Sequence, residues 1–159
     1  TSLLDAFDGR RFLYVSTDER YGVDQIDLST HKTVKRFIRD FSPVPYKMPD
    51  DLDAQDKEME RIAGRKYFND IWALCCLGED LMVFTSHLDE KNRVLVDRYS
   101  SEGRRIDSFF LTVPGVRRPD DLKNKPLCFD KDFFWTSFVD DDDNPVVVKY
   151  RVDWTAGKK

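Results

Sequence analysis

Residues 80–111 read DLMVFTSHLDEKNRVLVDRYSSEGRRIDSFFL and carry the strongest architectural signal in the chain. An apolar run ends in Thr85-Ser86, a polar turn follows, and the chain returns as the alternating sequence VLVDRY. A second turn, SSEG, leads into a third run, RIDSFFL. Short apolar or alternating runs that are separated by polar turns predict an antiparallel β-meander.

The same order of strand, polar turn and strand occurs at 11–38 and at 132–154. Thr136-Ser137 follows Thr85-Ser86 by 51 positions, and Tyr150 follows Tyr99 by the same interval, so these two copies align without a gap. Repeats of about 45 residues with several strands each are typical of propeller blades. The sequence therefore predicts an all-β fold, a partial β-propeller of about three antiparallel blades, in one domain.

The predicted blade-like units cover residues 11–48, 65–115 and 126–154. One short helical insertion is predicted at 50–63, between the first two units, because Leu52, Met59 and Ile62 recur at helical spacing among strong helix formers. The sequence PDDL at 49–52 recurs at 119–122, and the segment after this second copy is expected to be a loop.

Charge and hydropathy exclude two classes of function. The chain of 159 residues has a net charge of −4, and its basic residues are scattered in pairs among acidic ones, so a nucleic-acid partner is not expected. The longest apolar run, IWALCCL at 71–77, is far too short for a membrane span. The three cysteines form no C-x-x-C pair, which disfavours zinc.

Four consecutive aspartates, Asp140–Asp143, raise the question of a calcium site. Calcium loops place oxygen ligands at alternating positions around a glycine, whereas these carboxylates are contiguous and Pro145 ends the run. The second unit has the turn HLDEKN, residues 87–92, at the aligned position, so the position requires a polar turn and not a specific set of ligands. The sequence predicts a solvated hairpin tip here and a polar turn residue at His87.

Hydroxyl pairs recur at the end of the first strand of each unit, at Ser16-Thr17, Thr85-Ser86 and Thr136-Ser137. A nucleophilic serine needs a neighbouring base and a sharp turn such as G-x-S-x-G, and neither is present in the sequence. The recurrence instead indicates hydroxyls that satisfy backbone groups where strands end.

Three stretches resemble a known family: FNDIWALCCLGEDLMVFTS, VLVDRYSSEGRRIDSFFL and DNPVVVKYRVDW. The most specific element has the form D-x-[YF]-x-x-x-G-[KR] and spans Asp97 to Arg104. The chain is similar, over roughly 11–154, to the bacterial six-bladed β-propeller family related to NHL and TolB-like propellers. The resemblance implies that the chain corresponds to the C-terminal half of such a propeller.

The favoured hypothesis is a non-enzymatic binding or scaffolding module that presents rim loops to a protein, peptide or glycan and needs no cofactor. An insertion on one rim of a repeat protein often forms its binding face. The expected partner-binding residues lie at the end of the inserted helix and just after it, or are aromatics that either line a ligand site or pack between blades: Arg61, Arg65, Lys66, Tyr67, Trp72 and Trp135.

The alternative hypothesis, implied by the resemblance, is a lactonase-like, metal-dependent hydrolase with a calcium ion at the propeller axis. Its ligands would lie next to inner strands, at Asn69, Asp70, Asp130 and Asp132. Stabilisation by calcium would favour this enzyme, and indifference to calcium would favour the binding module.

Assembly and location are expectations of the same resemblance. An open stack of three blades leaves sheet edges and an apolar face exposed, so we expect a second copy of the chain to complete the ring. Relatives in this family are mostly exported, which implies a periplasmic or cell-envelope location.

Overall fold

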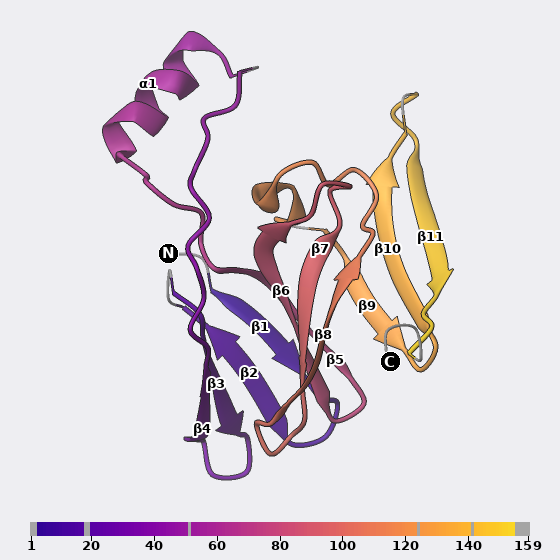
Figure 1. The fold of residues 1–159 in the computed structure, drawn as a ribbon. Helices are drawn as coiled ribbons and strands as arrows, with labels where there is room; N and C mark the ends of the chain where they lie inside the picture. Colours follow the sequence, from indigo (N-terminus) through magenta and orange to yellow (C-terminus); the bar gives the residue numbers. More distant parts are fainter. Residues whose placement is uncertain (1–2, 18–19, 51, 124, 141, 155–159) are drawn as a thin grey trace.

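The computed structural model describes residues 3–17, 20–50, 52–123, 125–140 and 142–154. These residues form three antiparallel sheets, one α-helix and one short 3-10 helix (Figure 1). The prediction of a mostly β fold is confirmed. The sheet within residues 71–111 lies between the sheet within 4–38 and the sheet within 127–151 (Figure 1).

Each sheet is a meander whose strands pair in sequence order. Sheet 1 contains β1 (Leu4–Phe7), β2 (Phe12–Ser16), β3 (Gly22–Asp27) and β4 (Lys32–Ile38). Sheet 2 contains β5 (Ile71–Leu77), β6 (Asp80–Leu88), β7 (Val94–Tyr99) and β8 (Arg105–Leu111). Sheet 3 contains β9 (Leu127–Asp130), β10 (Phe133–Val139) and β11 (Pro145–Arg151). The strand β1 precedes the first predicted unit, which began at residue 11.

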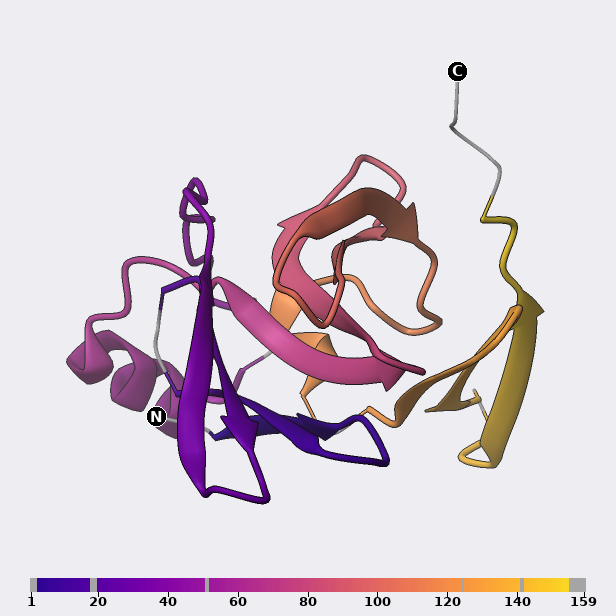
Figure 2. The same cartoon turned by 90° about the horizontal axis from the view of Figure 1, so that it is seen from below.

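Contacts between sheets involve their first strands, since β1 contacts β5 and β5 contacts β9. Figure 2 shows these three strands gathered on one side while the later strands of the sheets spread apart.

Sheet 2 is buried on both faces, which explains the continuous apolar run at the start of β6. Leu81 and Val83 face sheet 1, whereas Met82 and Phe84 face sheet 3, because successive side chains of a strand point to opposite faces. The core between sheets 1 and 2 contains Tyr14, Tyr21, Val23, Phe37, Ile71, Leu81 and Val83. The core between sheets 2 and 3 contains Trp72, Met82, Phe84, Val96, Phe129 and Phe134.

A buried carboxylate joins sheet 1 to sheet 2. Asp97 on β7 is fully buried, and its Oδ2 accepts a hydrogen bond from the Tyr21 hydroxyl at 2.8 Å. Arg39 forms an ion pair with the same oxygen, and the Ser108 hydroxyl donates to Oδ1 at 2.5 Å. A buried charge is tolerated when it is paired and hydrogen-bonded in this way.

The aspartate run forms the same turn as its counterpart in sheet 2. Asp89 and Asp140 each accept, through Oδ1, the N–H groups of residues two and four positions later, at 2.9 to 3.0 Å. Asn92 and Asp143 occupy the left-handed region with φ of 57° and 60°. The predicted polar hairpin is confirmed for the described residues, while Asp141 lies outside them.

The hydroxyl pairs partly fulfil the structural role predicted for them. Ser16 donates to the Gly22 carbonyl at 2.7 Å, and Thr85 donates to the Leu95 carbonyl at 3.0 Å. Within the described part of the chain, the hydroxyls of Ser86 and Thr136 have no partner.

The inserted helix, α1 (Ala54–Ala63), is shorter than predicted and buries none of its residues. It begins after residue 50 because Asp53 is the N-cap and accepts the Asp56 N–H at 2.8 Å. Among the described residues, no helix has the length and apolar character that crossing a bilayer requires. The second PDDL sequence forms the 3-10 helix η1 (Pro119–Leu122).

Replacing Tyr21 by Phe keeps the ring in the core and removes the hydroxyl that donates to Asp97. We expect a loss of about 1.5–3 kcal/mol in the free energy of unfolding, because the lost hydrogen bond involves a buried charge. The matched control is Tyr14→Phe, which loses only a neutral hydrogen bond with Gln25. Urea denaturation of both variants checks this, and an equal or smaller loss for Tyr21→Phe would contradict it.

Candidate functional site

The segment 39–70, which we call the arm, leaves sheet 1 after β4 and returns to β5 through a two-stranded ribbon. The Tyr46 N–H donates to the Lys66 carbonyl at 3.0 Å, and the Phe68 N–H donates to the Val44 carbonyl at 2.9 Å. Pro45 lies opposite Tyr67, at a position in the ribbon that requires no N–H donor. The ribbon therefore fixes the root of the arm, and α1 lies beyond it.

Gly64 ends α1 and turns the chain back toward the sheets. It has φ of 61°, a left-handed conformation that glycine adopts without strain, and its N–H donates to the Glu60 carbonyl at 3.2 Å. Burial and the nearby Glu60 carboxylate raise the pKa of the Tyr46 hydroxyl, and Arg118 next to η1 partly offsets this effect, so Tyr46 lies between the helix and the body. These contacts set the direction of residues 65–70.

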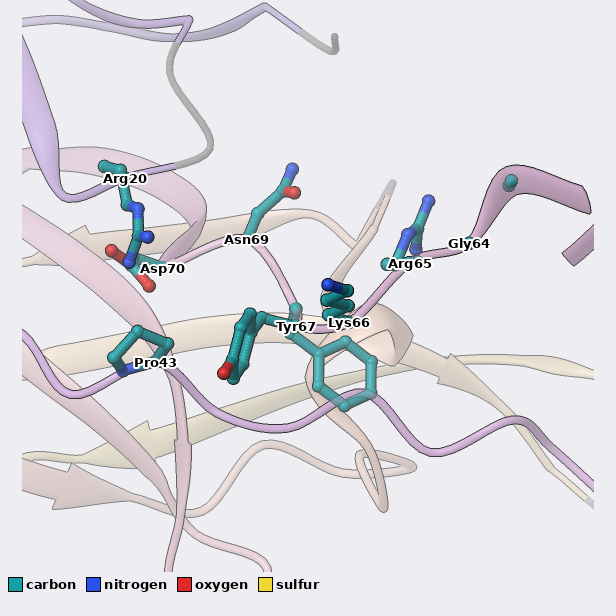
Figure 3. Close-up of a pocket in the computed structure, with 10 residues that line it drawn as sticks. Arg20, Pro43, Gly64, Arg65, Lys66, Tyr67, Asn69 and Asp70 are labelled. Atoms are coloured by element: carbon teal, nitrogen blue, oxygen red, sulfur yellow. The ribbon is translucent and has the colours of Figure 1, made fainter. Parts of the chain in front are cut away.

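A pocket of about 550 Å³ lies between the returning strand of the arm and the residues that precede β3 (Figure 3). Its lining is mostly polar and basic and comes from three parts of the chain. The described lining residues are Arg20, Pro43, Ala63, Gly64, Arg65, Lys66, Tyr67, Phe68, Asn69 and Asp70. Figure 3 shows Arg20 beside Asp70, with Asn69, Lys66 and Arg65 further along the returning strand.

Asp70 forms one wall of the pocket and also holds the sheets together. Its Oδ2 accepts the Tyr21 N–H at 2.8 Å, and its carbonyl accepts the Ser86 N–H at 3.0 Å. Burial raises the pKa of the Asp70 carboxyl, and the Tyr21 hydrogen bond and the nearby Arg20 and His87 only partly offset this effect. Asp70 thus has a structural role, because its side chain and its backbone carbonyl accept hydrogen bonds from Tyr21 and Ser86, respectively.

Three of the expected partner-binding residues, Arg65, Lys66 and Tyr67, are brought together as pocket lining. Arg65 also stacks over the Tyr46 ring, with its guanidinium carbon 5.2 Å from the ring centroid. Arg61 does not line the pocket, because it lies on α1 and pairs with Glu58 at 2.9 Å.

The two tryptophans expected to bind a partner lie elsewhere. Trp72 is only 8% exposed and belongs to the core between sheets 2 and 3, so little of its surface is available to a partner. Its position on the sandwiched strand β5 explains this burial. Trp135 lies on β10, where the Lys149 ammonium is 4.6 Å from its ring centroid.

The four expected metal ligands do not form one site. Asn69 and Asp70 line the pocket, whereas Asp130 and Asp132 are exposed at the turn between β9 and β10 and are not among its lining residues. Within the described ranges, no group of three or more His, Cys, Asp or Glu side chains is arranged to hold a metal ion.

Arg20 is the pocket residue that sequence reasoning missed. It lies in the first unit, just before β3, and no motif links it to the arm. Only the docking of sheet 1 against sheet 2 through Tyr21 and Asp70 brings Arg20 to the returning strand.

Comparison with known proteins adds no further assignment: no family model, no curated protein and no solved structure matches the chain.

Replacing Asp70 separates its charge from its hydrogen-bonding role. A raised folded-state pKa means that the native state holds this proton to higher pH than the unfolded chain does. Its stabilising contribution is therefore present at low pH and is lost as the pH rises through the folded pKa. We expect Asp70→Asn, which keeps an oxygen acceptor, to be at least as stable as the native chain at pH 7.

We expect that stability advantage to shrink as the pH falls toward 4. The control is Asp70→Ala, which leaves the Tyr21 N–H without a partner and should cost about 1–3 kcal/mol. Thermal and urea unfolding between pH 4 and pH 8 provide the measurement. A loss of stability in Asp70→Asn at pH 7 equal to that in Asp70→Ala would show that the charge itself is required.

Proposed function

We propose that the chain is a non-enzymatic binding module, a stack of propeller-type blades that presents the arm to a protein partner. The observation that carries this proposal is α1, a capped helix that buries none of its residues and lies apart from the three sheets in Figure 1. A segment held out in this way contributes little to the core and is available for contact.

The contacts between first strands support the propeller arrangement. In a propeller, the first strand of each blade lies nearest the axis and the later strands radiate outward. Contacts of β1 with β5 and of β5 with β9 fit this order, as does the meander in each sheet. Hydrogen bonds join Asp70, just before β5, to Tyr21 before β3 and to Ser86 near the end of β6. The arm therefore returns to the sheets at one end of the blades.

The exposed side chains of α1 fit a protein partner. Met59 is 55% exposed and Ile62 is 76% exposed, and a spacing of three residues places them on one face of the helix. Helices that bind in a groove use anchors with this spacing. An isolated helix of this length is marginally stable in water, so a partner that covers this face would also stabilise it.

A second cavity extends the surface along the outgoing strand of the arm. It has a volume of about 750 Å³ and is more apolar than the pocket at the root. Its lining includes Val44, Pro45, Met48, Pro49 and Phe68. An apolar cavity on the outgoing strand of the arm gives a partner a place for a large side chain, which is typical of interface anchors.

The double variant Met59→Ser, Ile62→Ser tests whether α1 serves binding or stability. Because neither side chain is buried, we expect the Tm to change by less than about 2 °C. A much larger fall would show that the helix packs on the body as a cap, and would contradict the proposed role.

Photo-crosslinking tests binding directly. We expect crosslinkers at positions 59 and 62 to capture a discrete protein from extracts of the source organism, identified by mass spectrometry. Crosslinkers in place of Val34 and Ile38, exposed apolar residues on β4, provide the matched control. Equal capture from both pairs of positions, or none from the helix, would contradict an arm-specific partner.

A further inference from the structure

The pocket at the root of the arm has the opposite charge from the chain as a whole. The chain carries a net charge of −4, whereas the described lining residues include three cations and one carboxylate, a local net charge of +2. A concave site lined by one sign of charge concentrates ligands of the opposite sign.

The cations of this pocket lack the partners that most other arginines have. Arginines in ion pairs are Arg10, Arg11, Arg36, Arg39, Arg61, Arg93, Arg98 and Arg118. Within the part of the chain that the structure describes, Arg20, Arg65 and Lys66 form no such pair with a carboxylate. Asp70 attracts Arg20, but its Oδ2 is occupied by the Tyr21 N–H. The donors of these three side chains remain available to a ligand.

Size and composition favour a small organic anion. A pocket of about 550 Å³ falls within the range of roughly 300–1,000 Å³ that is usual for small-molecule sites. Tyr67 is 49% exposed and offers a ring face, and the Asn69 amide can both donate and accept hydrogen bonds. Arginine forks match the geometry of carboxylate and phosphate oxygens.

We propose that this pocket binds the carboxylate or phosphate group of a small ligand, with Arg20, Arg65 and Lys66 as its donors. The ligand makes its contacts at the returning strand of the arm and at the residues before β3, and none of the donors lies on α1. The site is therefore separate from the helix face that the proposed protein partner would cover. Either proposal can fail without the other.

Backbone-amide NMR titration of the full chain tests the proposal with three probes. Galacturonate carries a carboxylate on a sugar ring, galactose is its neutral counterpart, and inorganic phosphate is the second anion. We expect galacturonate or phosphate to shift the amides of residues 64–70 and of Arg20, and galactose to leave them unchanged. A response to galacturonate identifies a carboxylate site, and a response to phosphate alone identifies a phosphate site.

Matched double variants decide whether the named side chains are responsible. We expect Arg20→Met, Arg65→Met to weaken binding of the responding anion at least about tenfold, since each charge-assisted hydrogen bond contributes that much or more. Arg104→Met, Arg105→Met removes two exposed arginines that are not in the pocket and should leave the affinity unchanged. Amide spectra of both variants establish that they remain folded.

Three results would overturn the proposal. The first is the absence of amide shifts at the pocket with both anions. The second is unchanged affinity in Arg20→Met, Arg65→Met. The third is an equal loss in the Arg104→Met, Arg105→Met control, which would show non-specific attraction to positive charge.

Discussion

The two hydrogen bonds of Tyr21 join sheet 1 to sheet 2 and to the end of the arm. Its hydroxyl donates to the buried carboxylate of Asp97, and its N–H donates to that of Asp70. Burying a carboxylate is costly unless its oxygens are satisfied, so sheet 2 requires the docking of sheet 1 at this point. The same docking places Arg20 against the returning strand of the arm. The fold and the pocket thus depend on one tyrosine that lies between two sheets.

Local patterns in the sequence predicted local structure well. The 51-residue offset between repeats holds at the hairpin, where Leu88 pairs with Val94 and Val139 pairs with Pro145. Turn chemistry is encoded by a few adjacent residues, so it can be read from sequence. The short strand β1 was missed because LDAF is too brief to show a period, and it becomes a strand only by pairing with β2.

Predictions failed where a residue's environment depends on contacts distant in sequence. The burial of Trp72 cannot be predicted from β5 alone, because sheet 3 is what covers that face. The spacing of Met59 and Ile62 predicted a helix, but the direction of α1 depends on the ribbon at the root of the arm. Arg20 carried no signal, because its neighbours in space come from another unit.

The sandwiched position of sheet 2 has a consequence for the two adjacent thiols on β5. Cys75 belongs to the core shared with sheet 3, whereas Cys76 packs against the core shared with sheet 1. Burial raises the pKa of both thiols, that of Cys76 to about 12, so the buried Cys75 and the partly buried Cys76 are both weak nucleophiles while the sheets stay packed. The exposure of each of these two thiols therefore depends on a different neighbouring sheet. Movement of sheet 3 away from sheet 2 would expose Cys75, and movement of sheet 1 would expose more of Cys76.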